Sequence, residues 1–182
     1  MHDEVVMPNP KLFIILNALS FQLVWWAGVL AGNQLLLLSI LLIIGHFLLS
    51  QSPAQDANIM CLCALLGMTV DTLLTWSGLF VFAQTPYWLA LLWLIFSLSL
   101  KYSLVFFQRI HIIGQALFGG IFGTLSYIAG AEFGAVDLPH GLWVTVGVLA
   151  VIGVYFFPYY CLLVVVIMPP FLCRGPGNEI SK

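Results

Sequence analysis

The chain has 182 residues, of which 62% are hydrophobic and only 7% carry a formal charge, and its mean hydropathy is +1.10. A soluble domain of this length needs far more charge on its surface, so the composition indicates an integral membrane protein. Five Lys and Arg against seven Asp and Glu give a net charge of −2, which is too small and too scattered for a nucleic-acid partner.

Six apolar runs divide the chain between polar or Pro/Gly breaks. A helix needs about 20 mainly apolar residues to cross hydrocarbon about 30 Å thick. Runs of this kind lie near 11–31, 33–50, 57–83, 86–107, 112–131 and 141–168. We therefore expect an all-α fold, a bundle of six transmembrane helices in a single membrane domain over 1–182, with short cytoplasmic tails at 1–10 and 174–182.

The few cations predict the orientation of this bundle. With six spans, Lys11, Arg109, Arg174 and Lys182 all fall on one side of the membrane. The loops of the other side carry no Lys or Arg, but they do carry acidic residues. Because short loops rich in Lys and Arg stay in the cytoplasm, both termini are expected there.

Under that topology the tryptophans gather in the outer half of the membrane. One interpretation is an interfacial belt at the outer surface, where Trp is favoured. A belt is ordinarily two-sided, so the other interpretation is an aromatic-lined cavity that opens outward. The residues concerned are Trp25, Trp26, Trp76, Trp88, Trp93 and Trp143.

Asp71 is the only charged residue between Ala57 and Leu100. A rise of about 1.5 Å per residue places it near the membrane midplane. A carboxylate at that depth is costly and by default indicates a functional site. We therefore expect Asp71 to face inward, into a polar pocket.

Two residues are the expected partners of Asp71. Gln22, in the first run, lies at a similar depth and is the first choice for a hydrogen bond. Lys101 is the second choice, although it lies about 10 Å nearer the cytoplasmic side. Its side chain can either reach Asp71 as an ion pair or extend to the cytoplasm, and the sequence leaves both open.

Other polar and aromatic residues complete the candidate ligand site. Trp93, Ser97 and Lys101 form a stripe at spacing four, which predicts a polar face on the fourth helix. Gln22 shares a helical face with Trp26, whereas Asn17 points about 140° away and lies closer in depth to Lys101. Tyr127 is placed at the outer end of the fifth helix, either in a solvated loop or at the mouth of the site. For Asn17, Gln22 and Ser97, plain hydrogen bonding between helices is the competing interpretation.

The fifth run, over 112–131, is rich in small residues at spacing four. Gly119, Gly120 and Gly123 are expected to let this helix approach its neighbours closely, as packing in lipid requires. Pro158 should kink or break the sixth helix, because it removes a backbone donor and clashes with the preceding turn.

The sequence carries no nucleophile elbow, P-loop, dinucleotide fingerprint or HExxH motif. No Cys or His stands at metal-ligand spacing, so neither a metal nor a cofactor is expected. One carboxylate without a recognisable set of partners is weak support for an enzyme.

Four segments resemble a family of bacterial membrane proteins, DUF2878. They are "NALSFQLVWWAGVLAGN" (17–33), "GMTVDTLLTWSGLF" (67–80), "PYWLALLWLIFSLSL" (86–100) and "FGGIFGTLSYIAGAEFGAV" (118–136). The resemblance implies a location in the inner membrane of Gram-negative bacteria, and it includes counterparts of Asn17, Gln22, Asp71, Trp93 and Tyr127. It implies no activity, because the family is uncharacterised. At Lys101 and Tyr102 the family is associated with Asn and His, so an Asp71–Lys101 pair is not expected of the whole family.

These observations favour a protein that binds or transports a small or lipid-like molecule in an outward-facing pocket around Asp71. The first alternative is an assembly subunit that docks another membrane protein through the Gly-rich fifth helix. The second is an enzyme that modifies lipids, with Asp71 as acid or base. The expected partners are therefore membrane lipid and either a small-molecule or lipid ligand or a membrane protein.

Overall fold

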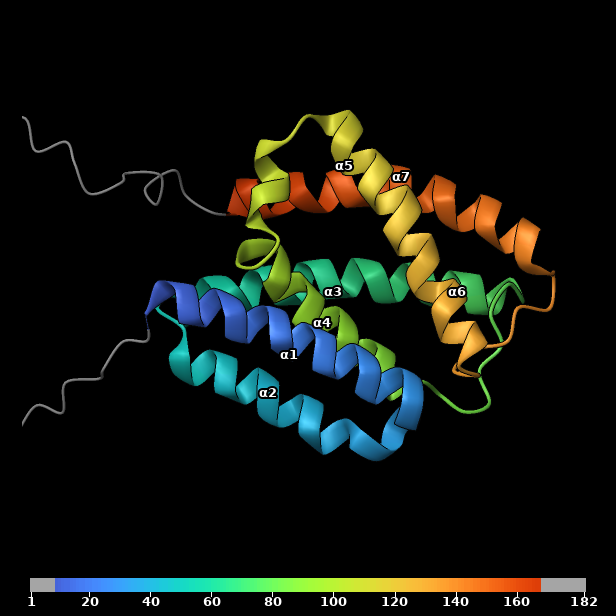
Figure 1. The fold of residues 1–182 in the computed structure, drawn as a ribbon, viewed down its shortest axis with the longest axis horizontal. Coiled ribbons are helices and arrows are strands. Elements are labelled where there is room, and N and C mark those ends of the chain that lie inside the picture. The colour runs from blue at the N-terminus through green and yellow to red at the C-terminus, as the bar shows by residue number, and fades with distance from the viewer. Residues whose placement is uncertain (1–8, 168–182) are drawn as a thin grey trace, which may run out of the picture.

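A computed structural model of the chain describes residues 9–167, and these residues are almost entirely helical (Figure 1). Beyond the helices, Val81 and Asp137 form an isolated antiparallel bridge between two connecting segments. The elements are α1 Pro10–Ala31, η1 Gly32–Leu35, α2 Leu36–Leu49, α3 Pro53–Trp76, α4 Tyr87–Lys101, η2 Val105–Arg109, α5 Ile112–Phe118, the π-helical turn η3 Gly119–Gly123, α6 Thr124–Glu132 and α7 Leu142–Ile167. The expected all-α class is therefore confirmed.

Four helical stretches are long and apolar enough to cross a membrane: Pro10–Leu49, Pro53–Trp76, Ile112–Glu132 and Leu142–Ile167. Tyr87–Lys101 is also apolar but has only 15 residues. Their length and composition are those of a multi-pass membrane protein. The expected count of six is not supported. The first two predicted runs form one helical stretch, so the described residues contain five apolar helical stretches, four long and one short.

α1, α2, α3 and α7 run back and forth along roughly one direction, whereas the run from α5 to α6 crosses it obliquely (Figure 1). Within the first stretch the chain reverses at Gly32, whose positive φ of 56° suits glycine, and α2 returns beside α1. We call the end of the bundle where α1 begins and α4 finishes the Lys101 end, and the opposite end the Trp76 end. Both Pro10 and Ile167 lie at the Lys101 end.

The third and fourth helices differ from their predicted bounds. α3 begins at Pro53, because Ser52 and Pro53 provide a cap position and a first turn that the sequence analysis assigned to a loop. It ends at Trp76, just before Gly78, whose φ is 78°. α4 ends at Lys101, after which the chain turns through η2. The tails at 1–8 and 168–182, with Cys173, Arg174 and Lys182, lie outside the described residues.

Glycines join η3 to α7. Gly119 and Gly120 are buried, and a Cβ added to Gly119 would lie 2.3 Å from the carbonyl oxygen of Gly153. Only glycine permits this approach of two backbones. Gly123 lacks such a neighbour within 4 Å. α7 continues as a helix through Pro158, so of the expected kink or break the break does not occur.

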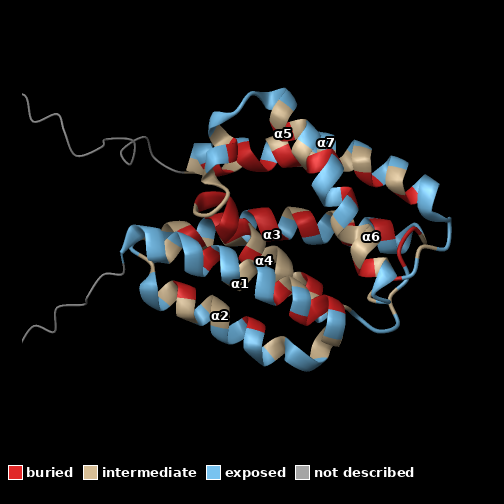
Figure 2. Cartoon of the chain, viewed as in Figure 1, coloured by how far each residue is buried: buried red, intermediate tan, exposed pale blue. Residues whose placement is uncertain are grey.

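Buried residues lie mainly along the lines where the helices meet, and also in the connecting segments around Phe80 and Val136 (Figure 2). Most outward-facing positions on α1, α2, α5 and α7 are exposed Leu, Ile, Val or Phe. The largest buried cluster joins α3, α4, η2 and α7 around Ile59, Leu100, Phe107 and Val164. An apolar exterior of this extent suits a protein whose solvent is lipid.

The η3–α7 contact gives a prediction. Gly119→Ala should lower the free energy of unfolding by about 1–3 kcal/mol, because the new methyl group has no room against Gly153. Gly147→Ala is the matched control, since Gly147 lies in α7 and has no atom within 4 Å of an added Cβ. Thermal unfolding in detergent measures both variants. Equal midpoints for the two would show that the glycine contact is not needed.

Candidate functional site

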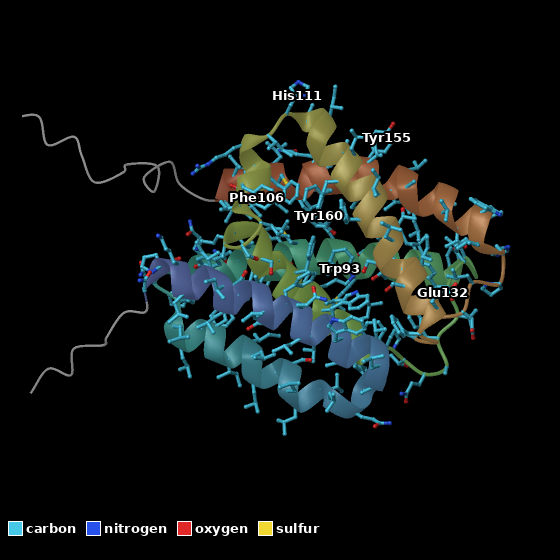
Figure 3. All side chains as sticks on the ribbon, in the orientation of Figure 1. Trp93, Phe106, His111, Glu132, Tyr155 and Tyr160 are labelled. Carbon is cyan, nitrogen blue, oxygen red and sulfur yellow. The ribbon has the colours of Figure 1, made fainter. Side chains whose placement is uncertain are left out.

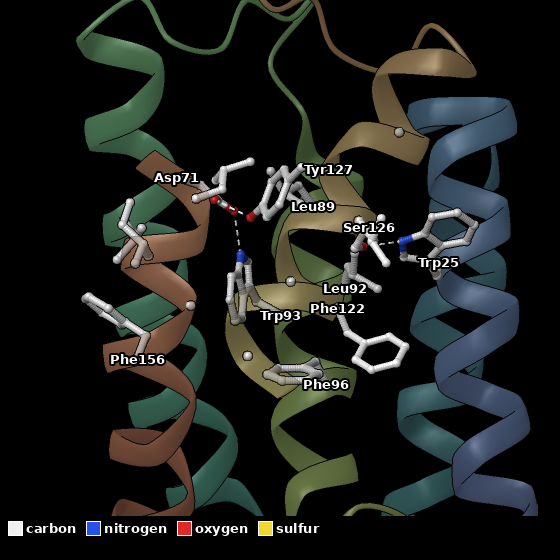
Figure 4. A pocket seen from close by; sticks show the side chains of 18 of the residues that line it. Trp25, Asp71, Leu89, Leu92, Trp93, Phe96, Phe122, Ser126, Tyr127 and Phe156 are labelled. Atoms are coloured by element: carbon white, nitrogen blue, oxygen red, sulfur yellow. Dashed lines mark hydrogen bonds between the residues drawn. The ribbon is translucent and has the colours of Figure 1, made fainter. Parts of the chain in front are cut away.

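A cavity of about 500 Å³ lies inside the bundle, a volume typical of small-molecule sites. Its walls come from α1, α3, α4, the run from α5 to α6, and α7 (Figure 4). We call it the Asp71 cavity. Its lining is mainly aliphatic and aromatic; the polar and larger aromatic side chains include Gln22, Trp25, Asp71, Trp88, Trp93, Ser126, Tyr127 and Tyr160.

Asp71 lies in the wall of this cavity, near the end of α3, and is 5% exposed. Trp93 Nε1 donates a hydrogen bond to one carboxylate oxygen over 2.5 Å, and the Tyr127 hydroxyl donates to the other over 2.5 Å (Figure 4). Gly67 permits the first contact, because a Cβ there would lie 2.3 Å from the Trp93 ring. The carboxylate is thus held from both α4 and α6.

The carboxylate keeps capacity for further bonds. An ionised carboxylate has about four acceptor positions, and each oxygen here has one donor among residues 9–167. Among the described residues that line the cavity, Asp71 is the only Asp, Glu, Lys, Arg or His. The cavity therefore offers a single acidic acceptor on an otherwise apolar wall.

Tyr160 adds a second polar group to this wall. Its side chain is 3% exposed and points inward between α4 and α7, near Trp93 (Figure 3). No hydrogen-bond partner for its hydroxyl lies within residues 9–167. Buried polar groups are usually satisfied, so an unpartnered hydroxyl beside the cavity is unusual.

The tryptophans divide between the two expected roles. Trp25, Trp88 and Trp93 line the cavity. Trp76 and Trp143 are among the most exposed side chains, at the Trp76 end. Their positions suit an interfacial belt.

The two expected partners of Asp71 do not bind it. Gln22 lines the cavity, but the donors to the carboxylate are Trp93 and Tyr127. Lys101 neither pairs with Asp71 nor extends into solvent; it is buried and its Nζ lies 2.5 Å from an oxygen of Asp56. A similar depth in the membrane was therefore not sufficient to predict which side chains contact Asp71.

The other candidate residues are scattered. The side-chain oxygen of Asn17 accepts a hydrogen bond from Ser103 Oγ over 2.8 Å, and Ser97 donates to the backbone of its own helix. Trp26 packs against Phe133 rather than lining the cavity. Gly119 and Gly123 line the cavity, and both Gly119 and Gly120 pack on α7.

Asp56 forms a second buried polar cluster that the sequence analysis missed. It is 0% exposed and, besides Lys101, it accepts hydrogen bonds from Ser50 Oγ at 2.5 Å and from the Tyr102 hydroxyl at 2.9 Å. His46 Nε2 lies 3.1 Å from the same carboxylate. Asp56 and Lys101 both lie at the Lys101 end, so the depth estimate applied to Asp56 would have brought the two together.

A sequence model described as "Protein of unknown function (DUF2878)" matches residues 14–159. The chain belongs to this family. The matched region contains α2 to α6 and most of α1 and α7, together with every described residue of the Asp71 cavity except Tyr160. No curated protein and no solved structure matches the chain.

The two acidic clusters of this DUF2878 protein differ in what surrounds them. Asp56 is saturated by donors and has a lysine counter-ion, whereas Asp71 has two neutral donors and a cavity beside it. Within residues 9–167, no group of three His, Cys, Asp or Glu residues is placed to hold a metal ion. Asp56 is thus enclosed by an ion pair and hydrogen bonds, whereas Asp71 borders a cavity.

The Asp56 cluster gives a prediction about stability. Lys101→Met leaves a buried carboxylate without its counter-ion and should cost about 3–5 kcal/mol of unfolding free energy. Adding Asp56→Asn to that variant should restore part of the loss, because the unpaired charge is then removed. Thermal unfolding of the single and double variants measures this. A single variant as stable as the wild type would contradict the structural role of the pair.

Proposed function

We propose that this DUF2878 protein is a membrane-embedded binding protein for a predominantly apolar molecule whose polar group contacts Asp71. The observation that carries the proposal is the position of Asp71, anchored by Trp93 and Tyr127 in the wall of a cavity of about 500 Å³. A carboxylate used only to join helices would need no such space beside it.

The chemistry of the cavity supports this choice. Its aromatic and aliphatic lining favours hydrocarbon, and a few polar groups fix the orientation of a ligand. Asp71 and the unpartnered Tyr160 hydroxyl supply those groups on one side. A ligand that donates a hydrogen bond to Asp71 satisfies both requirements of the site.

The alternative of an assembly subunit has less support. It requires the Gly-rich face of the fifth run to be free for another protein. Gly119 and Gly120 are instead covered by α7 of the same chain. A lipid-modifying enzyme remains the weaker alternative, since Asp71 is the only acid or base of its kind among the described lining residues.

We further propose that the chain crosses the inner membrane of Gram-negative bacteria six times as one domain, with both ends in the cytoplasm. The reversal at Gly32 supports separate crossings by α1 and α2. The 15 residues of α4 span about 22 Å, so the neighbouring segments must complete that crossing. Lys11 and Arg109 at the Lys101 end support a cytoplasmic location for that end.

The topology can be tested with reporter fusions. A fusion in the 51–58 segment should report cytoplasm, and a fusion in the 132–140 segment should report periplasm. As a control, detection of the full-length fusion protein through an exposed tag verifies that the protein has been inserted into the membrane. The reverse pattern would contradict the orientation, and the same compartment for both fusions would contradict the six crossings.

Native mass spectrometry after gentle detergent extraction tests the binding role. The wild type should retain a small molecule or lipid, and Asp71→Asn should lower its occupancy about tenfold, the effect of losing one charge-assisted hydrogen bond. Glu132→Gln is the matched control, because Glu132 is an exposed carboxylate outside the Asp71 cavity. Retention of a protein partner and no small molecule would favour the assembly subunit instead.

A further inference from the structure

We infer that the ligand of the Asp71 cavity is a single-chain amphiphile with an uncharged or cationic hydrogen-bond-donating head group, and that it enters sideways from the bilayer between α1 and η3. This inference rests on the proposed binding function and names the class of ligand and its route. The route follows from how the helices pack, and the class follows from the charge of the lining.

The helices on the two sides of this route pack on different neighbours. α1 packs against α2 and α4, whereas η3 packs against α5, α6 and α7. Within the part of the chain that the structure describes, α1 and η3 do not pack along one another. The boundary between them is therefore formed by side chains (Figure 4).

Toward the Trp76 end, two contacts join α1 to α6 and to the residue that follows it, and they close the boundary there. Trp25 Nε1 donates a hydrogen bond to Ser126 Oγ over 2.9 Å, and the rings of Trp26 and Phe133 lie 5.5 Å apart. Farther from that end, Phe21 and Phe122 line the cavity from α1 and η3. Phenylalanine side chains cannot hydrogen-bond across the boundary, so this part opens more easily than the Trp25–Ser126 contact.

The cavity reaches the outer surface of the bundle at this boundary. Phe122 and Leu125 both line it, yet they are 55% and 51% exposed. Neighbouring outward side chains, including Leu19 and Ile121, are exposed and apolar. Lipid chains rather than water are the solvent for such a surface. A ligand that moves along this route stays in contact with hydrocarbon.

The lining decides which head groups fit. Asp71 would repel a carboxylate or a phosphate, and no Lys, Arg or His among the described lining residues offsets that repulsion. An amine or a hydroxyl can donate to the free acceptor positions of Asp71. The hydrocarbon chain of the ligand then extends between Phe21 and Phe122 toward the bilayer.

Fluorescence quenching of Trp93 tests the route. The difference in emission between the wild type and Trp93→Phe isolates Trp93, which lines the cavity and bonds Asp71. In nanodiscs of phosphatidylcholine brominated on its acyl chains, this component should be strongly quenched, and aqueous iodide should have little effect. The same difference for Trp143→Phe provides a control at an exposed tryptophan outside the cavity.

The outcomes separate the route from the binding function. Quenching by iodide but not by brominated lipid would overturn the lateral route, and a molecule retained in native mass spectrometry would still support binding. Quenching by neither agent would overturn the route as well. Absence of any retained molecule, together with lipid quenching equal in wild type and Asp71→Asn, would overturn the binding function itself.

A second comparison tests the class of ligand. Bromine-terminated dodecylamine, dodecanol and dodecanoic acid carry the same chain with three different head groups. The amine and the alcohol should quench Trp93 at concentrations about tenfold lower than the acid, since the acid meets the charge of Asp71. Asp71→Asn should remove that preference. Strongest quenching by the acid would overturn the assigned head group.

Filling the cavity provides a test that keeps every tryptophan. Gly123 lines the cavity and has no atom within 4 Å of an added Cβ, so Gly123→Leu places a side chain in open space. It should reduce quenching by the brominated amine severalfold. Gly147→Leu, equally unobstructed but outside the cavity, should leave quenching unchanged. Equal quenching in both variants would contradict occupation of this cavity.

Discussion

The buried pair of Asp56 and Lys101 is the interaction on which the arrangement of the bundle depends. A charge removed from water is costly unless it is paired and hydrogen-bonded, and Asp56 is fully buried. Its partners come from α2, from the segment before α3, and from the end of α4. These elements must therefore meet at one point, which fixes α4 against α3. That alignment brings Trp93, about two turns before Lys101 in α4, to Asp71.

A buried charge must be paired or hydrogen-bonded, and the two buried aspartates of α3 meet this requirement in different ways. Asp56 meets a lysine, and both of its carboxylate oxygens accept hydrogen bonds from several neighbours. Asp71 meets only the neutral donors Trp93 and Tyr127, so its charge has no counter-ion among the described residues. α3 thus carries an ion-paired aspartate near one end and, near the other, an aspartate that has no counter-ion among the described residues.

Much of the fold was predictable because lipid imposes a simple pattern. The apolar runs and the breaks between them gave the all-α class, and the small residues over 112–131 indicated a closely packed helix. The count of six is not supported, because the first two predicted runs form one helical stretch that turns at Gly32. Separate crossings by α1 and α2 remain a proposal.

The candidate site was predictable only in part. Asp71 is conspicuous in the sequence, and Trp93 and Tyr127, which donate hydrogen bonds to it, were also among the predicted site residues. Its expected partners were wrong because similar depth only suggests candidates and does not show which helices are neighbours. Gln22 and Lys101 lie on helices whose rotation is set by long-range packing. The donors of Asp56 come from three segments, and no local pattern connects them.

The π-helical turn η3 sets the rotational phase of the helix that follows it. A π turn holds one more residue than an α-helical turn, so it rotates later side chains by about 100° relative to a regular continuation. Gly119 can therefore face Gly153 while Tyr127, on α6, faces Asp71. In a regular α-helix, the angle about the helix axis between Gly119 and Tyr127 would differ from the observed angle by about 100°. The single extra residue in η3 thus acts as an angular offset that lets one run serve both a tight helix contact and the acidic site.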